Sequence, residues 1–294
     1  MKLSNKVESM QFSPIRKFNP IAQKAKDAGK KVYHLNIGQP DVETPQCFMD
    51  AIKNYDSKVI AYAESGGLTV LQDAVTEYFK NYNMDIERKD MIVTTGGSEA
   101  LNMTFLSILN EGDEVLIAEP FYTNYHTFAT AAGGKVVPIT TKAEEGYHYA
   151  KREQIEPLIT EKTKAICCIN PGNPTGTVLT RDEMKLIGEI AKEHDLWIIA
   201  DEVYREFAYD GREATSFGQL DEFKERLEAQ EEGVTVKRNP ELKHKKRKPK
   251  EVEKPEEATA EIAVDDYVVI DVMVVLNTLP TVCVRYVHCH QAFS

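Results

Sequence analysis

One stretch of the sequence decides the fold: Ala165-Ile166-Cys167-Cys168-Ile169-Asn170-Pro171-Gly172-Asn173-Pro174-Thr175-Gly176. Its apolar first part is typical of a buried strand. In the second part, two prolines lack a backbone donor and two glycines allow dihedrals that other residues avoid, so neither a helix nor a strand can include it. Open α/β sheets bind ligands at such loops, at the C-terminal ends of their strands. A plain surface turn rich in Asn, Pro and Gly is the alternative.

Strand and helix patterns alternate around this stretch, from about residue 90 to residue 201. We predict strands at 91–95, 114–118, 135–139, 165–169 and 196–200. We predict helices at 98–109, 122–132, 154–159 and 181–194, the last of them capped by Thr180 with Glu183 at the capping-box position. Repeated strand–helix–strand units with almost continuously apolar strands indicate an α/β fold, a three-layer α/β/α arrangement with a mostly parallel sheet covered on both faces.

The rest of the chain divides into further segments. Helix patterns occur at about 19–29, 46–55 and 68–82, and an extended piece at 35–41 lies between the first two. From residue 225 to 263 the sequence is dominated by Lys, Arg and Glu, and we expect a disordered linker there, with a lone charged helix as the alternative. Residues 264–294 turn apolar again without helix–strand alternation, and we treat them as a divergent tail.

Composition restricts the class of protein. The 294 residues suffice for one large or two ordinary domains, and the net charge of −11 argues against general binding to nucleic acid or to anionic membranes. We expect no membrane span and no secretory leader, because apolar runs are short and Met1-Lys2-Leu3-Ser4 opens no apolar signal core. The five cysteines lack the spacing of a disulfide framework, so we expect reduced thiols and a cytoplasmic protein.

Chemistry-bearing residues follow three of the predicted strands. Gly96-Gly97-Ser98 begins a helix directly after a strand, where free N–H groups and the helix dipole suit an anion such as phosphate. Asn173 lies on the loop after a later strand, and Asp201 ends the next one. All three are expected at the carboxyl edge of one sheet. Taken singly, an ordinary helix start and an ordinary helix cap explain the first and the last equally well.

Taken together and in order, these residues belong to six sequence blocks. The blocks are Leu35-Asn36-Ile37-Gly38-Gln39-Pro40-Asp41, Tyr62-Ala63-Glu64-Ser65-Gly66-Gly67-Leu68, Thr95-Gly96-Gly97-Ser98-Glu99-Ala100-Leu101, Glu119-Pro120-Phe121-Tyr122, Asn170 to Gly176, and Asp201-Glu202-Val203-Tyr204. Between about residues 30 and 220 the chain resembles the class I/II aminotransferases, fold-type I pyridoxal-phosphate-dependent enzymes of the aspartate-aminotransferase kind. The resemblance implies transfer of an amino group between an amino acid and a 2-oxo acid, with pyridoxal 5'-phosphate (PLP) as cofactor.

The resemblance also implies roles for single residues. Backbone amides at Gly96, Gly97 and Ser98 would bind the cofactor phosphate, and Tyr122 would stack on the pyridine ring. Asn173 and Tyr204 would donate to the phenolic oxygen of the ring, and Asp201 would hold the pyridine nitrogen protonated. The backbone at Gly38 would approach the substrate carboxylate. Tyr62 would reach the phosphate of a neighbouring subunit, which implies a homodimer.

The lysine that binds the cofactor covalently in this family has no clear counterpart, so the catalytic residue stays unassigned. The nearest candidate is Lys237, but both flanking serines are absent and charged residues surround it, which favours an ordinary solvated lysine. The arginine that binds the substrate carboxylate is not matched either, since the context of Arg285 differs. The alternatives to an active aminotransferase are a truncated or chimeric non-catalytic member that keeps part of the PLP site, and a PLP-dependent lyase of the same fold.

We therefore divide the chain into four parts: 1–50, an N-terminal arm with part of a small domain; 51–224, an incomplete PLP-binding large domain; 225–263, the linker; and 264–294, the tail. The small domain is expected to be incomplete. The basic run at 243–250 is read as a solvated linker in preference to a nucleic-acid patch. No metal is expected, because the spacing along the chain does not follow a zinc-binding pattern at Cys283, His288, Cys289 and His290. A frame change or gene fusion after residue 225 is a further hypothesis, which reading the coding DNA in all frames would test.

Overall fold

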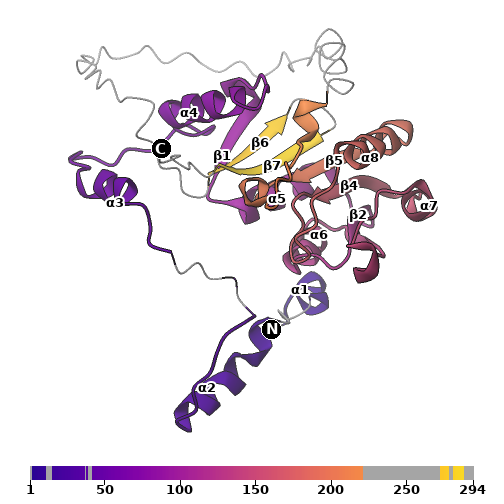
Figure 1. Cartoon of the computed structure of the whole chain (residues 1–294), viewed down its shortest axis with the longest axis horizontal. Coiled ribbons are helices and arrows are strands. Elements are labelled where there is room, and N and C mark those ends of the chain that lie inside the picture. Colours follow the sequence, from indigo (N-terminus) through magenta and orange to yellow (C-terminus); the bar gives the residue numbers. More distant parts are fainter. Residues whose placement is uncertain are drawn as a thin grey trace.

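The computed structural model describes residues 2–10, 15–36, 38, 42–220, 272–277 and 281–287, the last two as backbone only. Within these residues seven strands form one sheet with the order β1-β6-β7-β5-β4-β2-β3 (Figure 1). The strands are β1 (Met91–Thr94), β2 (Glu114–Ala118), β3 (Lys135–Ile139), β4 (Thr163–Ile169), β5 (Trp197–Asp201), β6 (Val272–Asn277) and β7 (Thr281–Val287).

The sheet is mostly parallel, as the sequence predicts. β2 pairs in parallel with β3 and with β4, β4 with β5, and β5 with β7. β6 is antiparallel to both of its neighbours, β1 and β7. The pairings of β1 with β6 and of β6 with β7 are both antiparallel, so β1 runs in the same direction as β7. Because β7 is parallel to β5, β1 also runs in the same direction as β5. The C-terminal ends of β1, β4 and β5 therefore lie at the same edge of the sheet.

Helices alternate with these strands and lie close to the predicted ranges. The helices are α1 (Asn5–Ser9), α2 (Asn19–Asp27), α3 (Gln46–Lys53), α4 (Thr69–Lys80), α5 (Gly97–Ile108), α6 (Asn124–Ala131), α7 (Arg152–Ile155) and α8 (Arg181–Glu193). Short 3₁₀ helices are η1 (Arg16–Phe18), η2 (Arg88–Asp90), η3 (Ala143–Glu145), η4 (Glu156–Leu158), η5 (Arg205–Phe207) and η6 (Phe217–Gln219). The helix predicted at 154–159 is split between α7 and η4, because Pro157 lacks the donor that an α-helix needs there.

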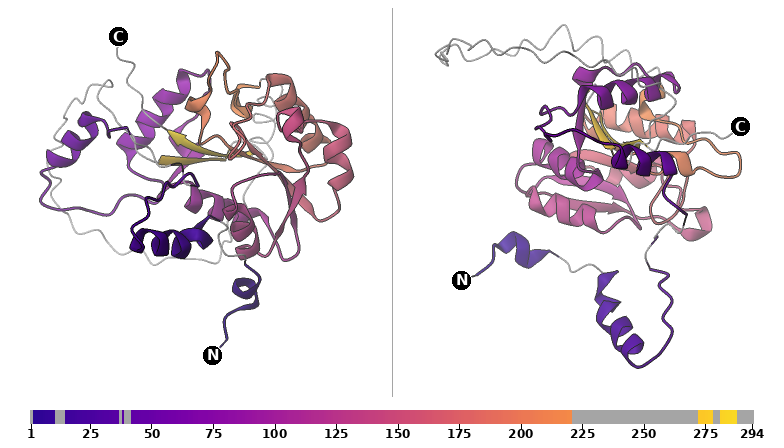
Figure 2. Two further views of the ribbon diagram at one scale, coloured as in Figure 1. Left: turned by 60° about the horizontal axis from the view of Figure 1, so that its bottom comes forward. Right: turned by 90° about the vertical axis from the view of Figure 1, so that its left-hand side faces the viewer.

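Two hydrophobic clusters pack on opposite faces of the sheet, which confirms the three-layer arrangement. On β4, Ile166 and Cys168 belong to the cluster that includes Phe79 of α4 and α8 side chains such as Ile187. Ala165 and Cys167 point the other way. They join a cluster that contains side chains of α5 and α6. Figure 2 shows helices on either side of the strands. Because both faces are covered, β4 is apolar along nearly its whole length.

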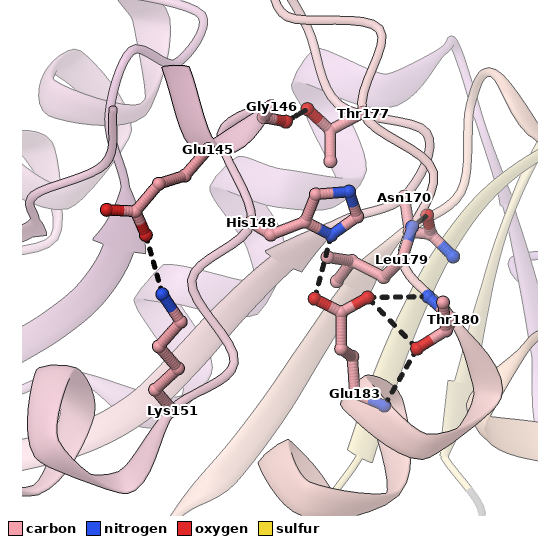
Figure 3. Close-up of polar contacts among 9 residues, drawn as sticks. All are labelled: Glu145, Gly146, His148, Lys151, Asn170, Thr177, Leu179, Thr180 and Glu183. Carbon is pink, nitrogen blue, oxygen red and sulfur yellow. Dashed lines mark hydrogen bonds and ion pairs between the residues drawn. The ribbon is translucent and has the colours of Figure 1, made fainter. Parts of the chain in front are cut away.

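The predicted capping box at the start of α8 is confirmed (Figure 3). The hydroxyl oxygen of Thr180 accepts a hydrogen bond from the backbone N–H of Glu183 at 3.2 Å. In return Glu183 Oε2 accepts from the backbone N–H of Thr180 at 2.8 Å. The other carboxylate oxygen, Oε1, lies 2.7 Å from Nδ1 of His148. The capping box thus also links α8 to the segment before α7.

The helices α2 and α3 stand apart from these layers. Figure 1 shows α2 and α3 away from the sheet. The residues of α2 and α3 are exposed or half-buried, and none of them is buried. Large apolar side chains are exposed here, among them Leu35 (95% exposed) and Ile60 (85%). Exposed apolar side chains of this kind are typical of a surface that another protein chain can cover.

The strands β6 and β7 were not among the elements predicted for residues 264–294. They form a hairpin-like pair that fills the space between β1 and β5. Lys237, the basic run at 243–250 and residues 288–290 lie outside the described residues, as do the side chains of Cys283 and Arg285. The four-part division of the chain stays a prediction. None of the helices in the described part of the chain combines the length and the apolar character that crossing a bilayer requires.

Candidate functional site

The loop at 170–177 is held in one conformation by its own polar groups and by its neighbours. The buried Asn170 side chain accepts from the backbone N–H of Leu179 at 2.9 Å and donates to the carbonyl oxygen of Thr215 at 3.2 Å. The hydroxyl of Thr177 donates to the carbonyl oxygen of Gly146 at 2.8 Å (Figure 3). Gly176 adopts a φ of 70°, which glycine tolerates best. These contacts hold the backbone of the loop in place, and with it the position of Asn173.

Asn173 and Tyr204 are brought together from different strand ends. The side-chain amide of Asn173 donates to the hydroxyl oxygen of Tyr204 at 3.3 Å. Both side chains stay partly open to solvent, with Tyr204 38% exposed. Each keeps hydrogen-bonding capacity for a further partner, since an amide and a hydroxyl have more donors and acceptors than this one contact uses.

Asp201 lies at the end of β5, where its carboxylate is 5% exposed. The hydroxyl of Tyr125 donates to Oδ2, and the backbone N–H of Val203 donates to Oδ1 at 3.1 Å. Burial raises the pKa of Asp201 to about 6, because removal from water disfavours the charged form, while both hydrogen bonds act in the opposite direction. A buried carboxylate of this kind favours a cationic partner.

The start of α5 follows β1 at the same edge. Gly96 has a φ of 109°, and a side chain there would be strained by the backbone conformation. The Glu99 carboxylate accepts from the backbone N–H of Thr95 at 2.6 Å and from its hydroxyl at 2.9 Å, which lowers the pKa of Glu99. Ser98 lies in the first helical turn, where backbone N–H groups lack intrahelical acceptors. The backbone N–H groups of this turn suit an anion.

Tyr122 lies two residues before α6 and is 37% exposed. Its hydroxyl oxygen accepts from the side-chain amide of Asn124 at 2.6 Å. Its ring packs edge-on against the ring of Tyr125, with centroids 6.3 Å apart and planes at 85°. The exposed part of the Tyr122 ring is available to a planar ligand.

Gly38 and Tyr62 differ from the other predicted residues. Tyr62 is 105% exposed and Gly38 is also exposed. A Cβ added at Gly38 would meet nothing within 4 Å. The predicted site residues thus fall into a group at the sheet edge (Gly96, Gly97, Ser98, Tyr122, Asn173, Asp201 and Tyr204) and two residues on the exposed N-terminal part of the chain.

A cleft of about 380 Å³, including open solvent at its mouth, adjoins this group. It is lined by Glu119, Thr141, Tyr147, Asn173 and Thr175, with other residues. Of the predicted site residues only Asn173 lines it, so the cleft lies beside Asp201 and not over it. In the described part of the chain, His, Cys, Asp and Glu side chains form no group of three or more that suits a metal ion.

Sequence reasoning missed two residues of this site. Tyr125 donates to Asp201, and its only sequence signal is its position one helical turn after Tyr122. Asn170 was not predicted as a site residue, but its side chain is 1% exposed and holds the loop together. The two asparagines have different surroundings, which the sequence pattern does not distinguish.

Comparison with known proteins places this geometry in a family. Residues 30–236 match the family model described as aminotransferase class I and II. An aspartate aminotransferase of Bacillus subtilis (strain 168) is 38% identical over 222 residues, which are 75% of this chain and 56% of that protein. An aromatic-amino-acid aminotransferase 2 of Thermococcus litoralis is 35% identical over 229 residues, 77% of this chain and 58% of that protein.

The fold agrees with solved structures of such proteins. A double mutant of the Thermus thermophilus aspartate aminotransferase has a TM-score of 0.69 at 32% identity, over 75% of this chain and 58% of that chain. This chain therefore spans little more than half the length of the curated relatives that it matches. The family match ends at residue 236, one residue before Lys237.

Proposed function

The chain belongs to the aminotransferase class I and II family, and from that premise we propose that it binds PLP and transfers an amino group from an amino acid to a 2-oxo acid. The observation that carries the proposal is the buried Asp201 carboxylate beside the Asn173–Tyr204 pair. The names of the relatives make aspartate and the aromatic amino acids the first donors to test.

The residues at the sheet edge fit PLP in their chemistry. In the described part of the chain, both hydrogen-bond donors to Asp201 are neutral, so a protonated pyridine nitrogen would supply the missing positive charge. Asn173 and Tyr204 offer donors for a phenolate oxygen. The first turn of α5 offers N–H groups for a phosphate, and no Cβ at Gly96 restricts access to it.

Each residue has a distinct task in the proposed reaction. PLP, when bound, supplies an electron-withdrawing ring that stabilises negative charge on the substrate Cα. Asp201 keeps the ring nitrogen protonated, which strengthens that effect. Asn173 and Tyr204 would orient the ring by its phenolic oxygen, while Tyr122 would cover one face and exclude water from it. Gly97 and Ser98 would hold the phosphate, and Gly38 would approach the substrate carboxylate.

Lys237 decides whether the chain is an active enzyme or a binding protein. A working aminotransferase needs a lysine that bonds the cofactor and moves a proton at the substrate Cα. The full chain is incubated with PLP and reduced with borohydride, and the modified peptide is identified by mass spectrometry. Modification of Lys237 alone, lost in Lys237→Arg, supports activity. Scattered modification of surface lysines, or none, would rule it out.

The second candidate is a non-catalytic family member that keeps part of the PLP site. It is favoured by the end of the family match at residue 236, because the residues that follow within this chain do not continue it. This candidate predicts reversible PLP binding without turnover of any amino acid. A PLP-dependent lyase of the same fold predicts release of product without a 2-oxo acid acceptor, so an assay with and without the acceptor separates the two enzyme classes.

We further propose that the chain forms a homodimer in which Tyr62 reaches the phosphate site of the neighbouring subunit. Tyr62 is fully exposed, and the apolar residues Leu35 and Ile60 of the N-terminal part of the chain are largely exposed, which supports this proposal. Sedimentation equilibrium measures the mass in solution, and a monomer at micromolar concentration would contradict it. A cytoplasmic location is supported by free Cys47, Cys167 and Cys168 and is tested by cell fractionation.

A further inference from the structure

Tyr125 and Asp201 are 76 residues apart in sequence and in direct contact in the fold. The Tyr125 hydroxyl donates to Asp201 Oδ2, and the backbone N–H of Val203 donates to Oδ1 at 3.1 Å. Each carboxylate oxygen therefore has one donor, which fixes the orientation of the group. Two donors leave further lone pairs unused, because a carboxylate can accept about four hydrogen bonds.

The packing of Tyr125 prevents its hydroxyl from turning away. Its side chain is 1% exposed on α6 and belongs to the cluster that includes Phe105 of α5 and Ile117 of β2. Its ring also contacts the ring of Tyr122 edge-on. A close-packed side chain has one rotamer available, so the hydroxyl stays directed at Asp201.

The described titratable groups around Asp201 offer no positive charge, so the ionised state of Asp201 depends on the hydrogen bonds that it accepts. Glu202 follows it in the chain, Cys167 faces it from β4, and Tyr204 lies near it. Among these described groups none is cationic. Burial alone would favour the protonated acid, and the hydrogen bond from Tyr125 favours the carboxylate.

We propose that Tyr125 is a positioning residue that keeps Asp201 ionised and directed at a protonated ring nitrogen, so that the site selects the pyridinium form of its ligand. The inference rests on the proposed function of the same site. It assigns Tyr125 no contact with the cofactor itself. Loss of the hydroxyl is expected to act on the ring nitrogen through Asp201 and to leave recognition of the phosphate unchanged.

The test uses the full chain and two ligands that need no lysine. These are pyridoxamine 5'-phosphate and its analogue with a C–H group in place of the ring nitrogen. Wild type is expected to prefer the nitrogen-containing ligand. Tyr125→Phe is expected to reduce this preference about tenfold, the worth of a hydrogen bond to a charged group. The acid limb of the binding profile is expected to move to higher pH in this variant, because loss of the donor raises the pKa of Asp201.

A matched control is Tyr78→Phe. The Tyr78 hydroxyl also donates to a carboxylate, that of Glu206, which keeps a second donor in Tyr82 at 2.8 Å. This variant is expected to keep the wild-type preference between the two ligands. A loss of preference in Tyr78→Phe equal to that in Tyr125→Phe would overturn the inference, since any lost tyrosine hydroxyl would then suffice.

The outcomes separate the inference from the proposed function. An unchanged preference in folded Tyr125→Phe would overturn the role of Tyr125 and leave the proposed function standing. Absence of binding to wild type would overturn both. If Tyr125→Phe does not fold, the NMR signal of the Tyr125 hydroxyl proton in wild type decides instead. A signal that shifts with the nitrogen-containing ligand and not with its C–H analogue supports the inference, and a signal that shifts equally with both overturns it.

Discussion

The backbone N–H of Asn170 donates to the carbonyl oxygen of Asp201 at 2.9 Å. This bond extends the β4–β5 ladder, in which Ile169 lies opposite Asp201, by one residue into the loop. The loop that carries Asn173 and the strand end that carries Asp201 are thereby joined through their main chains. Relative movement of the two groups would require this hydrogen bond to break.

Asn170→Ala is expected to lower the free energy of unfolding by about 3 kcal/mol, because the buried N–H of Leu179 and carbonyl of Thr215 lose their partner. Asn173→Ala is the matched control within the same loop, and its partly exposed side chain is expected to cost less than about 1 kcal/mol. Urea denaturation followed by circular dichroism measures both. Equal losses in the two variants would contradict the distinct role of Asn170.

Thr180→Ala is expected to lower the free energy of unfolding by about 1 kcal/mol, because it removes one half of the capping box of α8. Thr123→Ala is the control. Thr123 occupies the N-cap position of α6 but makes no side-chain cap hydrogen bond, so its replacement is expected to cost less. Thermal unfolding of both variants measures the difference, and a larger loss for Thr123→Ala would contradict the assignment of the caps.

Asp201 is expected to make stability dependent on pH. Its pKa in the folded chain, about 6, lies above the ordinary 3.8, so its contribution is fully present below about pH 4 and is lost as the pH rises through 6. The loss amounts to about 3 kcal/mol. In Asp201→Asn this loss is absent, so the variant gains stability relative to wild type as the pH rises from 4 to 7.

Urea denaturation of wild type and Asp201→Asn across this range measures the change. The control is Asp85→Asn, which makes the same replacement at an exposed aspartate. A difference between Asp201→Asn and wild type that stayed constant with pH would show that the Asp201 carboxylate carries no burial penalty.

Val284→Pro is expected to disrupt the centre of the sheet. Val284 pairs with Asp201 on one side and with Val275 on the other, and proline can neither donate to a ladder nor fit a central strand. Hydrogen exchange at the amides of β5 and β1 is expected to accelerate by an order of magnitude or more. Val287→Pro, at the last residue of β7, is the control and is expected to affect β5 less. Unchanged exchange in Val284→Pro would show that β7 does not support β5.

The strands β1 to β5 and the helices between them were predictable because their signal is local. β4 is an apolar run that ends at Asn170 and Pro171, and α8 begins with Thr180 and Glu183 at capping-box spacing. The strands β6 and β7 were not predicted. Their sequence, rich in β-branched residues, suits a strand, but their neighbours β1 and β5 lie far away along the chain. Propensity alone does not identify such distant partners.

The candidate site shows the same division. The positions of Gly97, Asn173 and Asp201 at the ends of three of the predicted strands predicted that they share one edge, and the strand pairing confirms that arrangement of strands. Tyr125 was not predicted, because a tyrosine on a helix is more often a core side chain than a partner for a carboxylate. Only the placement of α6 against β5 brings its hydroxyl to Asp201.

Residue type and spacing along the chain were enough to predict the family, the alternation of strands and helices, and the residues that the proposed cofactor site would use. Tertiary structure decided which of the two loop asparagines is buried, which tyrosine meets Asp201, and where β6 and β7 enter the sheet. The physical reason is that burial and hydrogen bonding depend on distances between segments remote in sequence. Those distances are set by the packing of both layers of helices against the sheet.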